Sequence, residues 1–179
     1  MSFPVRGSLL GMSPEQPQIE QRAEQPYVAV AAHVTSEAEF RQAADGGFPE
    51  LFGWLAEHGE APAGPPFIRY LAFDEEGEPL DIELAVPVGA GVSGDARVRA
   101  DSLPAGRWLT FLHVGPYTHA SEPDLAAAHT KVRAWADEQG LSLGGSVEEY
   151  RIGPVEEQDY SKWETELRYP LNEEENSHG

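Results

Sequence analysis

Residues 26–34 read PYVAVAAHV and residues 106–114 read GRWLTFLHV, and these two apolar segments decide the fold. They align at an offset of 80, which places His33 with His113. Each segment has the length and the β-branched or aromatic character of a strand. We therefore predict an internal duplication in which both halves follow the same order of elements.

A helix is expected after the first strand of each half. The segments around Trp54 and Trp135 align at an offset of 81, and they end at Gly59 and Gly140. Glycines at this position stop helices in a left-handed conformation. The GGFP segment at 46–49 predicts that the first helical region is broken into two shorter pieces.

The starts of both helices are also marked in the sequence. Ser36 and Glu39 have the spacing of a capping box. Ser121, Pro123 and Asp124 place a cap, a first-turn proline and a first-turn acid before the second helix. Both helices are therefore expected to begin close to these residues.

Two more strands are expected after each helix. Residues 67–71 correspond to residues 147–151 at an offset of 80, and residues 81–88 correspond to 164–171 through a shared Glu-Leu-x-x-Pro pattern at an offset of 83. Short turns between these segments exclude a doubly wound parallel sheet, because parallel strands need long crossovers. Each half is therefore predicted to be a β-α-β-β unit.

These elements predict an α+β fold with pseudo-two-fold symmetry. Two β-α-β-β units form an antiparallel sheet with helices on one face and a central cleft. The expected divisions are a flexible leader at 1–17, one domain at 18–171 with repeats at about 18–88 and 98–171, a link at 89–103 and a flexible tail at 172–179.

The composition excludes several classes of function. The 179 residues include 12 Lys and Arg against 31 Asp and Glu, for a formal charge of -19, which argues against direct nucleic-acid binding. No cysteine, secretory signal or apolar run long enough to span a membrane is found, so we expect a cytoplasmic protein without membrane contact. No metal-binding or phosphate-loop motif occurs, so neither a metal nor a cofactor is expected.

One acidic residue breaks the symmetry of the repeat. Glu148 occupies the position that Ile68 holds in the first half, whereas Glu83 and Glu166 are equivalent to each other and are expected to be structural or exposed. Glu148 is either on a wetted strand face or placed in an aromatic cleft, where burial raises its pKa and makes it a general base or a cation partner. Its neighbour Glu149 faces the other side of the strand.

Two aromatic residues are expected near the cleft between the halves. Trp163 replaces Leu80 at the start of the last strand, and Tyr117 follows the turn at 115–116. Aromatic walls around one carboxylate suit a flat, apolar and often cationic ligand. The alternative for each residue is an ordinary structural role, in the core for the tryptophan and in a turn for the tyrosine.

The motifs of both halves resemble GyrI-like small-molecule-binding domains over about residues 18–171. These motifs are LPAGRW at 103–108, HVGPY at 113–117, Glu148-x-Tyr150, WETEL at 163–167, QPYVAV at 25–30, WLAEHG at 54–59 and GPPFIRY at 64–70. The family provides effector-binding domains to AraC-type and MerR-type regulators and also occurs alone. Its fold, built from duplicated SH2-like units, agrees with the one predicted from the residues.

The resemblance implies a cleft for hydrophobic or cationic small molecules. The strand glutamate of the family falls on Glu148, and the residues implied as aromatic lining are Trp163, Tyr117, Tyr70, Phe67 and Tyr150. The stretch between Gly140 and Glu148 is shorter than in many stand-alone relatives, which predicts a more open rim.

Three functions follow from the resemblance. The first is a stand-alone protein that senses or sequesters a xenobiotic. The second is a cyclopropanoid cyclohydrolase that opens strained DNA-alkylating natural products, with Glu148 as general base and Tyr117 or Tyr70 as proton donor. The third is a modulator of a protein partner such as gyrase, in which the acidic surface mimics DNA.

Overall fold

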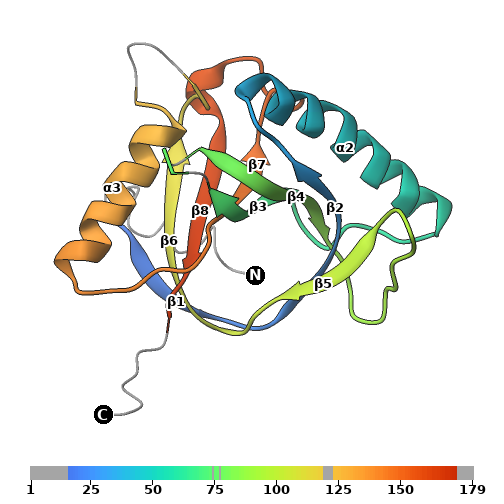
Figure 1. Cartoon of the computed structure of the whole chain (residues 1–179), viewed down its shortest axis with the longest axis horizontal. Helices are drawn as coiled ribbons and strands as arrows, with labels where there is room; N and C mark the ends of the chain where they lie inside the picture. The colour runs from blue at the N-terminus through green and yellow to red at the C-terminus, as the bar shows by residue number, and fades with distance from the viewer. Residues whose placement is uncertain (1–15, 74, 77, 119–122, 173–179) are drawn as a thin grey trace.

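Figure 1 shows the computed structural model, which describes residues 16–73, 75–76, 78–118 and 123–172. Eight antiparallel strands form one curled sheet in the order β1-β6-β8-β7-β3-β4-β2-β5. The strands are β1 (Gln18–Arg22), β2 (Gln25–His33), β3 (Phe67–Phe73), β4 (Pro79–Pro87), β5 (Arg99–Leu103), β6 (Gly106–Val114), β7 (Val147–Ile152) and β8 (Glu164–Pro170). The helices are α2 (Glu37–Glu57), α3 (Leu125–Glu138) and the short 3-10 helix η1 (Tyr160–Lys162). The predicted α+β class is confirmed.

The strand order shows the duplication directly. Each strand of the first half has a counterpart in the second: β1 corresponds to β5, β2 to β6, β3 to β7 and β4 to β8. When every strand is replaced by its counterpart, the result is the same strand order read from the other edge of the sheet. The edge strands were not predicted, and β5 lies inside the expected link at 89–103. Each half is therefore β-β-α-β-β, and the halves exchange edges, because β1 pairs with β6 and β5 pairs with β2.

Helix α2 is one continuous helix of 21 residues, so the predicted break at 46–49 is wrong. Gly47 is buried against the sheet, and a Cβ atom there would lie 3.2 Å from Cγ of Leu84. The glycine therefore permits a close approach of helix and sheet. Pro49 lies within the helix although it has no N–H group to donate. Neither described helix combines the length and apolar character needed to cross a membrane.

The first helix begins at its predicted cap, whereas the second begins later than predicted. The Ser36 side chain accepts a hydrogen bond from the backbone N–H of Glu39. Asp124 was predicted as a first-turn acid but is the N-cap of α3, where its side chain accepts a hydrogen bond from the N–H of Ala127. Ser121, the predicted cap, lies outside the described residues. Both helices stop before glycines in the left-handed region, at 59 and 140.

The structure aligns β2 with β6 one residue differently from the alignment that the sequence suggested. The registers of β2 with β4 and of β6 with β8 place Val28 and Leu109 in equivalent positions, at an offset of 81. A shift of one residue moves a side chain to the other face of a strand. His33 is accordingly exposed beside Asp81, whereas His113 is buried, so the two histidines are not equivalent.

A row of directly paired residues crosses the centre of the sheet. Leu84 pairs with Ile68, Ile68 with Glu148, and Glu148 with Leu167. Directly paired residues point to the same face. Leu84 lies in the cluster beneath α2 and Leu167 in the cluster beneath α3, so both helices cover this face and Glu148 lies between them.

The opposite face of the sheet carries paired charges. Glu83 is 1% exposed and contacts Arg99, whereas Glu166 contacts three guanidinium groups. The ion pairs around Glu166 involve Arg22, Arg151, Arg168, Glu20 and Glu149. The structural role expected for Glu83 and Glu166 therefore lies in ion pairs, which reach from β4 across β2 to β5 and from β8 to β7 and across β6 to β1.

Candidate functional site

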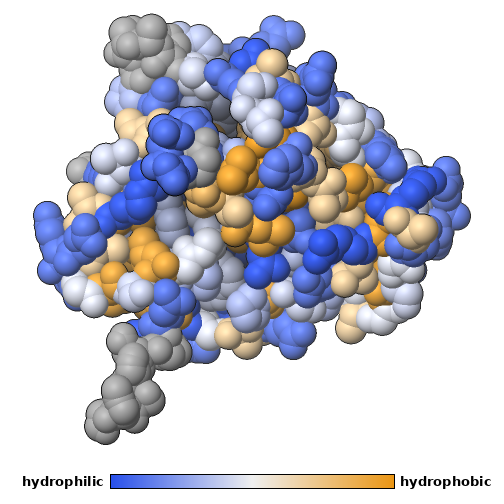
Figure 2. Space-filling view, in the orientation of Figure 1, coloured by the Kyte–Doolittle hydropathy of each residue, from blue (hydrophilic) through white to orange (hydrophobic). Residues whose placement is uncertain are grey.

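A cavity of about 510 Å³ opens between α2 and α3, above the middle of the sheet. We call it the central cavity. Its lining comprises Val34, Thr35, Ser36, Glu37, Phe40, Tyr70, Phe73, Glu78, Pro79, Thr118, Leu125, Ala126, His129, Thr130, Arg133, Ser146 and Glu148. Figure 2 shows apolar side chains exposed in this region, within a surface that is otherwise largely hydrophilic. The central cavity thus lies where the two repeats meet, on the face of the sheet that both helices cover.

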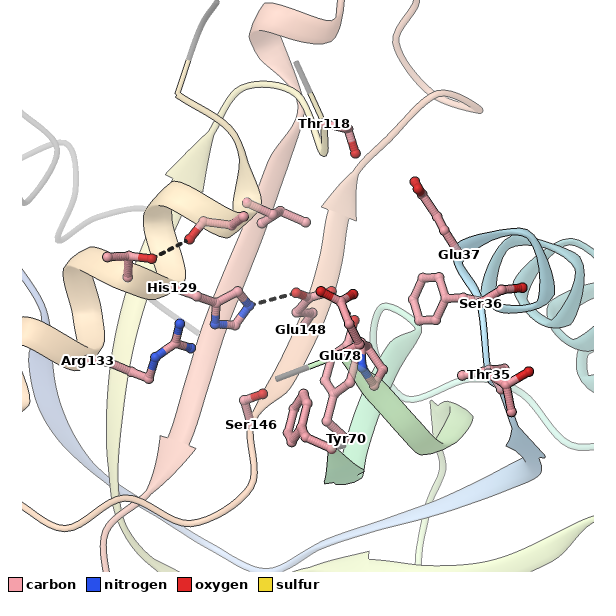
Figure 3. Close-up of a pocket in the computed structure, with 17 residues that line it drawn as sticks. Thr35, Ser36, Glu37, Tyr70, Glu78, Thr118, His129, Arg133, Ser146 and Glu148 are labelled. Atoms are coloured by element: carbon pink, nitrogen blue, oxygen red, sulfur yellow. Dashed lines mark hydrogen bonds and ion pairs between the residues drawn. The ribbon is translucent and has the colours of Figure 1, made fainter. Parts of the chain in front are cut away.

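Glu148 lies at the base of the central cavity and accepts hydrogen bonds from three side chains. The hydroxyl groups of Tyr70 and Tyr150 donate to Oε1 over 2.8 and 2.6 Å. His129 contacts Oε2 through Nε2 at 2.7 Å, as Figure 3 shows. The carboxylate is only 6% exposed, so these donors replace the water that it loses on burial.

The environment of Glu148 favours its charged form. Burial alone raises the pKa of the carboxyl group, but the hydrogen bond and the charge interaction with His129, together with the bonds from Tyr150 and Tyr70, outweigh burial and lower the pKa. The expectation of a raised pKa is therefore wrong, because it considered burial without these donors. Glu148 is an anion at neutral pH and a weak base.

His129 continues the hydrogen-bond network away from the carboxylate. Its Nδ1 contacts the hydroxyl group of Tyr169, which also accepts from Nη1 of Arg133 at 3.3 Å. Burial raises the pKa of Tyr169 to about 12, so its hydroxyl group stays protonated. A line of polar groups therefore runs from Glu148 through the imidazole to helix α3 and strand β8.

Three stacked rings form an aromatic wall on the other side of the central cavity. The ring of Tyr70 lies between those of Phe40 and Phe73, with centroid distances of 6.3 and 5.7 Å and interplanar angles of 11° and 19°. Phe73 is 47% exposed, so part of this wall faces solvent. Such a wall can contact a flat apolar group, and its ring faces attract cations.

The charges around the central cavity are mainly acidic. Glu37, Glu78 and Glu148 line it, against the single guanidinium group of Arg133 among the described lining residues. Glu148 is the buried member, and its charge is therefore less screened by water than a charge at the rim. Glu37 is exposed and paired with Arg41 at 2.9 Å, so Glu148 is the charge that dominates the base of the central cavity.

Tyr117 and Trp163 form a second aromatic cluster beside the central cavity. Their rings lie 4.7 Å apart, and Tyr117 also contacts Tyr150, the donor to Glu148, at 5.7 Å. Neither residue belongs to the described cavity lining. The structure therefore places them behind Tyr150, and the expectation that they share a cavity with Tyr70 and Glu148 is wrong.

Phe67 lies on the opposite face of the sheet from Glu148. It pairs with Glu149, whereas Ile68 pairs with Glu148, and neighbouring residues of a strand point to opposite faces. Phe67 is 2% exposed and lines a separate cavity of about 360 Å³, together with Trp108 and paired charges. It is therefore a core residue without access to the central cavity.

Most of the cavity lining was not predicted from the sequence, and four of the missed residues matter most for its chemistry. They are His129, Arg133, Phe40 and Phe73. His129 could have been found in the sequence, because it follows Leu125 by four residues and so lies on the apolar stripe of its helix. A polar side chain in that position needs a hydrogen-bond partner. The other three are typical surface or strand residues, and only the meeting of the two halves brings them together.

Neither cavity has the side-chain composition of a metal site. Within the described residues, no group of three His, Asp or Glu side chains is placed to hold a metal ion. Glu148 has one histidine neighbour, and its remaining partners are tyrosine hydroxyl groups. The polar groups of the central cavity are thus arranged around a buried carboxylate.

A family model agrees with this architecture. The model of the GyrI-like small molecule binding domain matches residues 15–172, which is most of the chain. No curated protein sequence matches the chain.

Three solved proteins show the same fold. The C-terminal domain of EcmrR superposes with a TM-score of 0.73 at 19% identity, covering 89% of this chain and 98% of that domain. In the complex of EcmrR with DNA, the match covers 63% of the EcmrR chain. A hydrolase from Listeria innocua has a TM-score of 0.60 at 14% identity, covering 95% of this chain and 98% of that one. SAV2435 bound to tetraphenylphosphonium has a TM-score of 0.58 at 15% identity, covering 91% of this chain and 98% of that one.

Proposed function

The chain belongs to the family of GyrI-like small molecule binding domains, and from this premise we propose that it binds hydrophobic cations in the central cavity. Glu148 is the charge partner of the ligand, and the stacked rings of Phe40, Tyr70 and Phe73 contact its apolar groups. Such binding serves to sense or sequester a xenobiotic. The observation that carries the proposal is the buried, ionised carboxylate of Glu148 at the base of an open cavity with an aromatic wall.

The physical argument concerns the single charge at the base of the central cavity. Three donors hold Glu148 in place and fix its orientation. A carboxylate has about four acceptor positions, and three of them are used by these donors. Glu148 can therefore still attract a cation without losing any of these hydrogen bonds. A lipophilic cation carries a weak hydration shell and loses little on entering an aromatic site, where it gains cation-π attraction as well as the charge pair. The cavity volume of about 510 Å³ is in the range of drug-sized sites.

Tetraphenylphosphonium is a suitable probe, because SAV2435 of the same fold is known with this cation bound. Its charge does not change with pH, and tetraphenylborate offers nearly the same shape with a negative charge. We expect calorimetry to detect binding of the cation and much weaker binding of the anion. Equal affinity for both probes contradicts a role for charge.

Glu148→Gln tests the assigned carboxylate. Removing the charge is expected to weaken tetraphenylphosphonium binding by about tenfold or more, as for other desolvated charge pairs. Glu149→Gln is the matched control, because it makes the same change one residue along the strand, on the opposite face. The control is expected to lose stability through its pairs with Arg151 and Arg168 while keeping its affinity. Equal losses of affinity in both variants contradict the assignment.

A hydrolase is the second candidate function. The observation that favours it is the line Glu148, His129 and Tyr169, since a carboxylate and an imidazole in contact can position water for general base catalysis. The lowered pKa of Glu148 weakens this case, because a good base titrates close to the working pH. Incubation with a cyclopropane-containing alkylating agent tests it. A ring-opened hydrate formed by the wild type and lost in Glu148→Gln establishes catalysis, and its absence leaves binding as the function.

A further inference from the structure

The hydrogen bond between His129 and Glu148 constrains where a proton can reside. Both carboxylate oxygens of Glu148 have donors, and Oε2 faces Nε2 of His129 at 2.7 Å. An ionised carboxylate only accepts hydrogen bonds, so Nε2 carries a hydrogen whether the ring is neutral or charged. Any additional proton must therefore bind to Nδ1.

The partner of Nδ1 accommodates both states of the ring. The hydroxyl group of Tyr169 can donate to an unprotonated Nδ1, and after rotation of its hydrogen it can accept from a protonated one. Ser146 and Arg133 also interact with the Tyr169 hydroxyl. The imidazole of His129 can therefore gain and lose a proton without changing its position.

We infer that His129 couples cation binding to proton release, so that the central cavity binds a cation when the imidazole is neutral and loses affinity when the imidazole is charged. The inference rests on the proposed function and adds to it the residue that sets the charge of the site. His129 acts here as a positioning and charge-setting residue through Glu148, whose carboxylate faces the ligand.

The electrostatic reason is the short distance between the two groups. With a neutral ring, the pair of His129 and Glu148 carries one negative charge. With a protonated ring, the pair is a salt bridge of no net charge, with side chains only 13% and 8% exposed. A cation entering the central cavity then loses its counter-charge and meets an additional positive group.

The imidazole is surrounded by carboxyl, phenol and guanidinium groups. The titratable and charged side chains from the surrounding elements are Glu148 and Tyr150 on β7, Tyr70 on β3, Tyr169 on β8, Arg133 on α3, Glu37 on α2 and Glu78 before β4. Carboxyl, phenol and guanidinium groups ordinarily change charge outside the range of about pH 5.5 to 8, where histidine changes its charge. Beside the charged imidazole the pKa of Glu148 is lowered, because the hydrogen bond and charge interaction with His129 and the bonds from Tyr150 and Tyr70 outweigh burial.

Thermodynamic linkage makes the coupling measurable in two ways. If protonation weakens cation binding, cation binding must expel the proton to the same degree. The dissociation constant of tetraphenylphosphonium is expected to fall roughly tenfold between about pH 5.5 and pH 8, within the usual range of coupling between sites. Within this range, binding is expected to release a fraction of one proton to the buffer.

Calorimetry in buffers of different ionisation enthalpy measures this proton release. Titrations of wild type with tetraphenylphosphonium are compared with His129→Gln, whose amide keeps a side-chain N–H for Glu148 but does not titrate. The variant is expected to bind with an affinity that is independent of pH and to release no proton. His58→Gln is the matched control, since His58 contacts Trp54 at the end of α2 and does not line the central cavity.

The outcomes separate the inference from the proposed function. Binding by the wild type without proton release, or with no change of affinity between about pH 5.5 and 8, overturns the inference and leaves the proposed function intact. The same proton release in His129→Gln also overturns it. Absence of tetraphenylphosphonium binding at every pH overturns both. The wild-type titrations decide the question even if His129→Gln fails to fold.

Discussion

Tyr70 and Tyr150 occupy equivalent positions in the two repeats and donate hydrogen bonds to the same oxygen atom, Oε1 of Glu148. The acceptor has no such symmetry, because Glu148 pairs across the sheet with Ile68, its own counterpart in the first repeat. The duplicated fold thus supplies two matching donors, and one change from an apolar residue to a carboxylate supplies the group that both donors hold. An asymmetric site arises in this way at the centre of a symmetric scaffold.

Removal of either tyrosine hydroxyl group is expected to destabilise the protein. Tyr70→Phe and Tyr150→Phe each remove one bond to a buried charge, which contributes about 1.5–3 kcal/mol to the free energy of unfolding. In the double variant Oε1 has neither of these donors, so the loss is expected to exceed the sum of the two single losses. Urea denaturation at neutral pH measures all three variants. Additive losses argue against a shared acceptor.

The stability of the protein is expected to depend on Glu148 in acid. The pKa of this carboxyl group is lowered in the folded state from its ordinary value of 4.5, so its contribution is fully present above 4.5 and is lost as the pH falls through the lower, folded pKa. Glu148→Gln lacks this contribution. The stability gap between wild type and variant, on the order of 1–2 kcal/mol at neutral pH, should therefore narrow as the solution is acidified. Denaturation series at several pH values test this, and a gap that widens in acid has the wrong sign.

Two phenylalanines on opposite faces of the sheet provide a matched pair for the aromatic wall. Phe40 stacks on Tyr70 in the central cavity, whereas Phe67 is buried in the core of the other face. Phe40→Leu is expected to weaken tetraphenylphosphonium binding about threefold to tenfold through loss of aromatic contact, with little change in stability. Phe67→Leu is expected to lower the free energy of unfolding by about 1 kcal/mol and to leave affinity unchanged. The reverse result places the ligand in the other cavity.

A glycine next to strand β7 controls the approach of the two repeats. A Cβ atom on Gly145 would lie 2.7 Å from the backbone carbonyl oxygen of Tyr70, which cannot move without shifting β3. Gly145→Ala is therefore expected to destabilise the protein by about 1–3 kcal/mol and to weaken ligand binding. The control is Gly53→Ala in α2, where no heavy atom lies within 4 Å and alanine should stabilise the helix by about 0.5–1 kcal/mol. Thermal or urea denaturation of both variants measures the contrast, and a neutral Gly145→Ala contradicts the close approach.

The sequence predicted the elements with strong local signals. These signals are the apolar strand segments, the cap at Ser36 and the glycines in the left-handed region after each helix. Each signal depends on only a few neighbouring residues, and the duplication allowed one half of the sequence to be checked against the other. The edge strands were missed because each carries few apolar residues and gains its partner from the other half. The one-residue shift that separates His33 from His113 was missed because only cross-strand pairing fixes the register.

The sequence by itself determined the duplication, the α+β class and the singular position of Glu148, because these depend on the order and spacing of residues along the chain. Only the tertiary structure decided what surrounds that carboxylate. Strand pairing turned Phe67 away from it, the packing of α3 brought His129 to within 2.7 Å, and the meeting of the repeats joined Tyr70 to Tyr150. The sign of the pKa shift follows from these contacts between distant segments, since burial alone raises the pKa of Glu148 and only the assembled donors lower it.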